Sequence, residues 1–155
     1  MLPRLQRSLT TIGMLLVLLL VGTSLAWAAE PAKENAPSAE DVRQEVAQTL
    51  KTIGHYSVKQ RDKAVATARE ALRKTDAAID RMQRKVDRDW DSMDAAARKN
   101  ARDTLDALRK ERTDLAEWFG GMEHSSAKAW DEIKKGFAKS YSNLADSLGK
   151  AADKF

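Results

Sequence analysis

The chain has 155 residues, 43% of them apolar and 32% charged, which fits one soluble domain and is too short for two. Its 27 basic and 23 acidic residues are mixed along the sequence, so it lacks the basic stripe expected of a nucleic-acid-binding protein. It has no cysteine, which excludes disulfides, a cysteine-linked lipid anchor and a thiolate nucleophile. Three prolines and seven glycines, in a chain rich in Ala, Lys, Arg, Asp and Leu, favour an all-α protein of long helices.

Residues 1–28 have the three parts of a secretory signal peptide. Arg4 and Arg7 supply the positive start, and residues 12–21 form the apolar run. The sequence Ala26-Trp27-Ala28 matches the A-x-A pattern of a cleavage site. The pattern therefore predicts export, with the bacterial periplasm as the expected compartment.

An uncleaved inner-membrane anchor is the alternative, because residues 8–29 are uncharged and long enough to span a bilayer. We expect cleavage, since the strongly apolar part has the length of a signal peptide rather than of a membrane span. Residues 29–38 hold two of the three prolines and show no apolar period, which predicts a flexible lead. A helical coiled-coil domain is then expected over residues 39–155.

One long helix is predicted from Ser38, a suitable N-cap, to about Trp90. Its apolar positions recur mostly in steps of three and four, and they are Val42, Val46, Leu50, Ile53, Leu72, Thr75, Ile79, Met82 and Val86. Gly54 costs about 1 kcal/mol in a helix interior, which so long a helix can tolerate. At a rise of 1.5 Å per residue the helix would be about 80 Å long. We therefore expect residues 38–63 to project as an arm that favours dimerisation.

A second helix is predicted to begin at Ser92 or Asp94 and to end at Gly120-Gly121, since paired glycines favour a left-handed cap. Ser125 or Ser126 would cap a third helix that continues to Phe155. Short connections make consecutive helices antiparallel neighbours. The predicted fold is therefore a long antiparallel helical hairpin or three-helix coiled-coil bundle with a projecting N-terminal arm.

The third predicted helix has an apolar stripe flanked by lysines, among them Lys128, Lys139 and Lys150. Such a stripe is most often a bundle core, but lysines beside an aromatic-rich stripe are also typical of a helix at a membrane surface. We therefore treat the stripe as a candidate interaction face for neighbouring helices, a membrane or an unfolded protein. Its residues are Trp130, Ile133, Phe137, Tyr141, Leu144, Leu148 and Phe155.

Catalytic and metal-binding patterns are missing from the sequence. The two histidines are His55 and His124, and His55 has Lys51 and Lys59 at the spacing where a second metal ligand would be needed. No nucleophile elbow, Gly-rich phosphate loop or zinc-protease motif occurs. We therefore expect no enzyme activity, no metal and no cofactor.

Three segments together resemble small bacterial coiled-coil proteins of the stress-response type, and they are also similar to apolipoprotein-like helical segments. The segments are Leu72-Arg73-Lys74-x-Asp76-x-x-Ile79, Leu105-x-x-Leu108-Arg109-Lys110-x-Arg112-x-x-Leu115 and Ala129-Trp130-Asp131-Glu132-Ile133-Lys134-x-Gly136. The similarity covers roughly residues 50–155. It implies a helical architecture and an association with envelope stress, without catalytic residues.

The sequence thus predicts an exported, non-enzymatic helical protein that acts by binding. Our leading hypothesis is a structural or envelope-stress-related interaction module whose helices pair with each other and could pair with a second copy. One alternative is peripheral binding to a lipid surface through the last helix. Another is a periplasmic holdase-type chaperone that grips unfolded proteins between its helices.

Overall fold

The computed structural model describes residues 36–155, and every regular element in this part of the chain is helical. The prediction of an all-helical protein is therefore confirmed for these residues. The α-helices are α1 (Ala39–His55), α2 (Arg61–Asp89), α3 (Ala95–His124) and α4 (Trp130–Ala152), with short 3-10 turns η1 (Val58–Gln60) and η2 (Trp90–Ser92) between the first three. None of these helices is long and apolar enough to cross a membrane. The predicted signal peptide lies outside the described residues.

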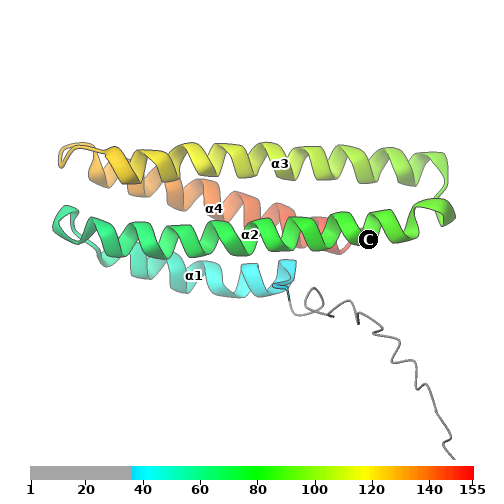
Figure 1. Cartoon of the computed structure of the whole chain (residues 1–155), viewed down its shortest axis with the longest axis horizontal. Coiled ribbons are helices and arrows are strands. Elements are labelled where there is room, and N and C mark those ends of the chain that lie inside the picture. The colour runs from blue at the N-terminus through cyan, green and yellow to red at the C-terminus, as the bar shows by residue number, and fades with distance from the viewer. Residues whose placement is uncertain (1–35) are drawn as a thin grey trace, which may run out of the picture. The chain divides into compact units, whose positions relative to one another are not determined.

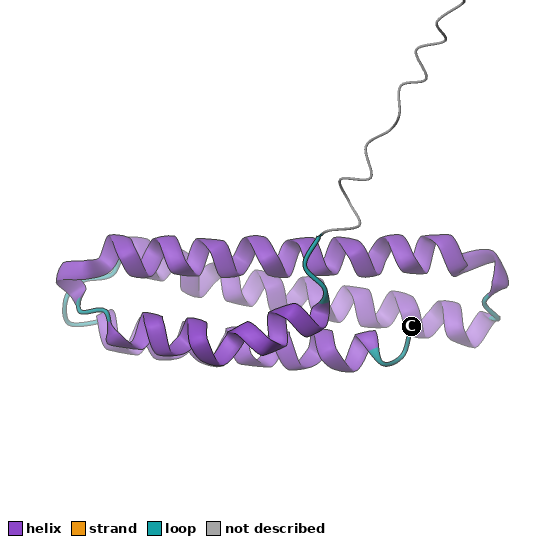
Figure 2. Cartoon of the chain, turned by 90° about the horizontal axis from the view of Figure 1, so that it is seen from below, coloured by secondary structure: helices purple, strands orange, loops and turns teal. Residues whose placement is uncertain are grey.

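The four helices lie side by side in a bundle in which each helix packs mainly on two neighbours. Helix α2 packs between α1 and α3, and α4 packs between α3 and α1. Consecutive helices run in opposite directions (Figure 1). Since α2 and α3 are longer than α1 and α4, the turn that joins α2 to α3 extends beyond the other two helices (Figure 2).

The prediction of a single helix from Ser38 to Trp90, with a projecting arm, is wrong. The helix ends at His55, because Tyr56 adopts an extended conformation with φ −80° and ψ 125°. The backbone N–H of Ser57 donates to the side chain of Gln60 at 3.3 Å and stabilises the turn into α2. Helix α1 then folds back onto α2 and α4, where it buries Val42 and Ile53. The bundle therefore has four helices rather than three, and the arm that suggested dimerisation does not project.

The prediction that Gly120-Gly121 ends the second long helix is also wrong. Helix α3 continues through both glycines to His124, and Ser125 is its C-cap. Met122 is fully buried just beyond the glycines, and Phe119 packs against the core just before them. Burial of these two side chains outweighs the helix penalty of about 1 kcal/mol for each glycine.

The predicted N-caps at Ser38 and Asp94 are confirmed. The Ser38 hydroxyl accepts a hydrogen bond from the backbone N–H of Asp41 at 3.2 Å, and the Asp41 carboxylate accepts one from the backbone N–H of Ser38 at 2.7 Å. The Asp94 carboxylate accepts a hydrogen bond from the backbone N–H of Ala97 at 2.7 Å. These contacts satisfy backbone donors that an uncapped helix start leaves free. Helix α4 begins at Trp130, later than the predicted serine caps, and has no side-chain cap.

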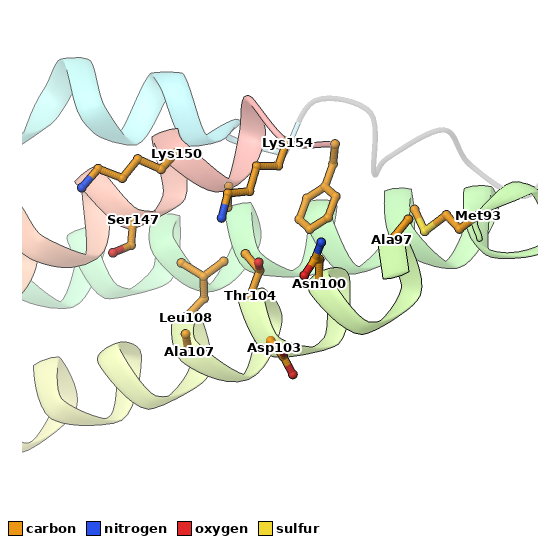
Figure 3. A pocket seen from close by; sticks show the side chains of 12 residues that line it. Met93, Ala97, Asn100, Asp103, Thr104, Ala107, Leu108, Ser147, Lys150 and Lys154 are labelled. Atoms are coloured by element: carbon orange, nitrogen blue, oxygen red, sulfur yellow. The ribbon is translucent and has the colours of Figure 1, made fainter. Parts of the chain in front are cut away.

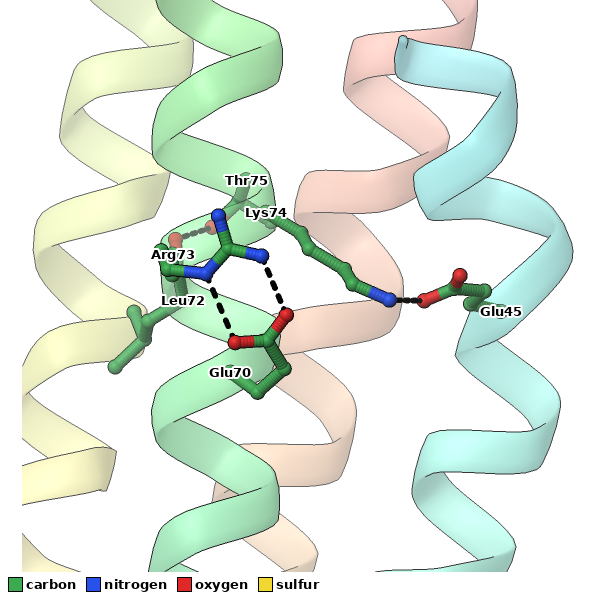
Figure 4. Close-up of polar contacts among 6 residues, drawn as sticks. All are labelled: Glu45, Glu70, Leu72, Arg73, Lys74 and Thr75. Atoms are coloured by element: carbon green, nitrogen blue, oxygen red, sulfur yellow. Dashed lines mark hydrogen bonds and ion pairs between the residues drawn. The ribbon is translucent and has the colours of Figure 1, made fainter. Parts of the chain in front are cut away.

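An ion pair joins α1 and α2, and further polar contacts lie within α2 (Figure 4). Lys74 on α2 donates to Glu45 on α1, and the hydroxyl of Thr75, which is fully buried, donates to the carbonyl of Leu72 at 2.7 Å. Within α2, Arg73 donates two hydrogen bonds to Glu70, at 2.8 and 2.6 Å, and lowers the pKa of that carboxyl. Thr75 thus fills a predicted apolar position because its hydroxyl is satisfied within its own helix.

Candidate functional site

The predicted interaction face on α4 lies mostly inside the bundle. The five members that are buried, with at most 2% of their surface exposed, are Trp130, Phe137, Tyr141, Leu144 and Leu148. Ile133 and Phe155 are half-buried and pack against the core. The stripe is therefore the surface by which α4 contacts α1 and α3, and a membrane or another protein could reach it only if the bundle opened.

Trp130 ties the start of α4 to the turn between α1 and α2. Its indole N–H donates to the carbonyl of Tyr56 at 3.1 Å, and Lys134 donates to the same carbonyl at 2.9 Å. The guanidinium of Arg61 lies 5.7 Å from the centre of the Trp130 ring, within range of a cation–π contact. The indole thus has both an apolar and a polar role, holding two loops of the bundle together.

Tyr141 is the largest fully buried side chain of the described residues. Its hydroxyl approaches Thr49 of α1 without forming a hydrogen bond of normal geometry. Burial raises the pKa of Tyr141 to about 12, because the ionised phenolate would lose its hydration. The side chain therefore stays neutral and acts as part of the core.

An open groove of about 840 Å³ lies between α3 and the C-terminal half of α4 (Figure 3). We call it the α3–α4 groove. Most of its wall is apolar, and the apolar side chains are Met93, Ala97, Ala107, Leu108, Ala151 and Phe155. Three of these are alanines, whose small side chains leave space between the two helices. Met93, before the start of α3 at Ala95, and Phe155, after the end of α4 at Ala152, both contribute to the lining.

The two sides of the groove differ in charge. Lys150 and Lys154 line it on the α4 side, and Asp103 lines it on the α3 side. Asp103 forms an ion pair with Lys99 at 2.6 Å, whereas neither groove lysine forms an ion pair with any residue in the described part of the chain. The α4 side of the groove is therefore a positive rim beside an apolar floor.

A hydrogen bond joins α4 to α3 where Ser147 lines the groove. The hydroxyl of Ser147, which lines the groove, donates to Oε1 of Glu111 on α3 at 2.9 Å. The second carboxylate oxygen of Glu111 is buried without a hydrogen-bond partner. A carboxylate thus lies next to the groove at Ser147, although Glu111 is not itself part of the lining.

The predicted absence of metal chemistry concerned His55 and His124. Both are exposed, and each is the last residue of a helix, α1 and α3 respectively. Over residues 36–155, the structure brings together no group of three or more histidine, aspartate or glutamate side chains that could hold a metal ion.

Comparison with known proteins gives no match, whether to family models, to curated proteins or to solved structures.

The α3–α4 groove was not predicted from the sequence, although a signal for it was present. Met93, Ala97, Asn100, Thr104 and Ala107 recur in steps of four and three, which is the spacing of a second stripe along α3. The stripe consists mainly of small or weakly polar residues, so the larger leucines at Leu105, Leu108 and Leu115 hid it in the sequence.

Proposed function

We propose that the protein is a non-enzymatic helical binding module that holds an apolar part of a partner in the α3–α4 groove. The single observation that supports this proposal is the apolar groove itself, on a helix that elsewhere carries exposed ion pairs such as Lys99–Asp103 and Lys110–Asp114. Its volume of about 840 Å³ lies within the usual range for ligand pockets. Ligand-binding sites are usually concave and mostly apolar with a few polar groups, as this groove is.

Export to the periplasm and a role in envelope stress belong to the same proposal. They are supported by the signal-peptide pattern of residues 1–28 and by the resemblance of residues 50–155 to stress-response coiled-coil proteins. Mass spectrometry of the protein recovered from the cell envelope tests whether it is exported and cleaved. A mature chain that begins at Ala29 is expected, and a full-length chain beginning at Met1 would favour the membrane anchor instead.

The groove itself is tested with the uncharged dye Nile red, whose fluorescence rises in apolar surroundings. Ala107 is exposed and lines the groove, so Ala107→Trp should fill the groove without disturbing the core. The matched control is Ala47→Trp, at an exposed position on α1. We expect at least tenfold weaker dye binding by Ala107→Trp and no change for Ala47→Trp. Equal binding by both variants and the wild type would contradict the proposed function.

A second proposed function is peripheral binding to a membrane surface after the bundle opens. The supporting observation is that α4 has its apolar stripe on one side and exposed lysines without ion pairs, Lys135 and Lys139, on the other. Flotation with anionic and neutral vesicles tests it, with hydrogen exchange of the bound protein as the second measurement. If the bundle opens on vesicles, the backbone amides of α1 and α4 should lose their protection from hydrogen exchange. Failure to float with anionic vesicles would eliminate this function.

A further inference from the structure

We infer that the α3–α4 groove binds a single-chain anionic amphiphile, specifically the carboxylate form of a fatty acid. This inference rests on the proposed binding function and names the ligand of the same groove. It follows from three features: an apolar floor, a positive rim along one side of the groove and the Glu111 carboxylate, which is hydrogen-bonded to the lining residue Ser147.

The apolar channel fits one extended hydrocarbon chain. From Ala97 to Leu108 the groove follows α3 over about 16 Å, at 1.5 Å per residue. The small side chains of Ala97 and Ala151 leave room along the walls of the groove. Leu108, with 1% of its surface exposed, forms part of its floor. Met93 and Phe155 also line the groove and add apolar surface for the hydrocarbon chain.

The positive rim fits a carboxylate head group. Lys150 lies in the last turn of α4 and Lys154 in the turn that follows the helix, and both line the groove. Figure 3 shows the two side chains, Lys150 from α4 and Lys154 from the turn after it, on the side of the groove opposite Asp103. Because Asp103 is already paired with Lys99, it does not neutralise the two groove lysines. Their ammonium groups are thus available to a bound anion.

Glu111 sets the direction of the bound molecule. Its carboxylate accepts a hydrogen bond from Ser147, which lines the groove, and would repel a second carboxylate placed next to Ser147. The head group therefore stops at Lys150 and Lys154, and the hydrocarbon chain runs toward Met93 and Phe155. A cationic amphiphile bound in the same orientation would place its positive head group beside two lysines, which would repel it.

The test uses the mature full chain, titrated calorimetrically with octanoate, decanoate and dodecanoate below their micelle concentrations. Affinity is expected to rise with chain length, by up to about fourfold for each added methylene. Dodecyltrimethylammonium, with the same chain length and a positive head group, should bind at least tenfold more weakly than dodecanoate. Ala107→Trp should abolish binding of all the carboxylates.

Charge reversal at the rim distinguishes the contribution of the head group to binding from that of the hydrocarbon tail. The double variant Lys150→Glu, Lys154→Glu should weaken dodecanoate binding at least tenfold and leave Nile red binding unchanged. The matched control is Lys128→Glu, Lys139→Glu, which makes the same change in net charge at exposed positions outside the groove. It should bind both ligands as the wild type does, and thermal unfolding checks that each variant is folded.

The outcomes distinguish the two proposals. If Ala107→Trp weakens Nile red binding but the double variant Lys150→Glu, Lys154→Glu binds dodecanoate as the wild type does, the fatty-acid inference fails and the proposed function stands. If neither ligand depends on Ala107, both fail. If sedimentation shows a dimer that Ala107→Trp dissociates, a second copy occupies the groove and the fatty-acid inference is overturned.

Discussion

The indole of Trp118 on α3 covers Gly136 on α4 so closely that a side chain at residue 136 would collide with it. A Cβ atom placed on Gly136 would lie 2.3 Å from Cε3 of the indole. The absence of a side chain therefore lets the two helices approach at this end of their interface. At the other end, around Ala107 and Ala151, the same pair of helices is separated by the α3–α4 groove.

Gly136→Ala should destabilise the protein. The collision with Trp118 is expected to cost about 1–3 kcal/mol, partly offset by the gain of about 1 kcal/mol in helix propensity. The matched control is Gly120→Ala in α3, where an added Cβ meets no atom within 4 Å. That change should stabilise the protein by up to about 1 kcal/mol. Urea unfolding followed by circular dichroism measures both effects, and equal shifts in the same direction would contradict the role of Trp118.

Arg112 and Asp76 should contribute a measurable link between α3 and α2. Arg112 donates two hydrogen bonds to the Asp76 carboxylate, at 2.6 and 2.7 Å, but the two side chains are 32% and 45% exposed. Solvent screening therefore limits the expected coupling to about 1 kcal/mol. A double-mutant cycle with alanine measures it, and the coupling should decrease at high salt.

The pair Lys110–Asp114 is the control for that cycle. It lies within α3, its nitrogen-to-oxygen distance is 3.3 Å, and its lysine is 78% exposed. Its coupling should be about 0.3–0.5 kcal/mol, the usual value for exposed pairs four residues apart in a helix. If both pairs gave the same coupling free energy, the two hydrogen bonds between Arg112 and Asp76 would stabilise the protein no more than an ordinary exposed ion pair does.

Leu108→Asp and Ile79→Asp should each destabilise the bundle by several kcal/mol, because each places a carboxylate at a buried position. Leu108 is 1% exposed and Ile79 is 7% exposed, so the change at Leu108 should cost more. Thr113→Asp, at an exposed position on α3, should change stability by less than about 0.5 kcal/mol. The free energy of unfolding in urea checks all three, and near-wild-type stability at Leu108 would refute the observed packing.

Tyr141 should make the protein lose stability in alkaline solution. Its ordinary pKa is 10.0 and its pKa in the folded protein is about 12, so the unfolded chain releases the proton first. The contribution is fully present below pH 10 and is lost as the pH rises toward 12, with a magnitude on the order of 2 kcal/mol. Tyr141→Phe removes this loss, and it costs little at neutral pH because the hydroxyl has no hydrogen bond of normal geometry. Unfolding curves of both proteins across this pH range provide the comparison.

The helical periodicity predicted the core well, because burial follows the apolar pattern directly. Ile79, Met82 and Val86 on α2 and Leu105 and Leu115 on α3 were all expected on helix seams, and all are buried. The caps at Ser38 and Asp94 were predicted for a local reason, since a short polar side chain satisfies nearby backbone donors.

The errors arose where contacts distant in the sequence decide the structure. Residues 56–60 contain neither proline nor glycine, and the fold reverses there because α1 gains a second neighbour in α4. Gly120-Gly121 gave a strong signal for a helix end, but burial of Met122 keeps the residues helical. A periodic pattern reports which residues are buried and not which helix covers them.

The candidate site was the least predictable part. Its lysines, Lys150 and Lys154, look like ordinary solvent-facing charges in the sequence, and its alanines have no binding signature. The groove depends on the different lengths of α3 and α4 and on the small side chains between them, which become visible only in the packed structure. The predicted stripe on α4 was easy to find because core positions carry the largest apolar residues.

The contact between α1 and α4 joins the first and last helices of the described chain and has a consequence for the order of folding. During synthesis α1 leaves the ribosome first, followed by α2 and α3, and these three can begin to pack on one another. One flank of α1, with Val42 and Ile53, still lacks the helix that completes its burial. A nascent chain that has not reached residues 130–152 therefore keeps an apolar surface exposed, and the packing of α4 is the step that completes the bundle.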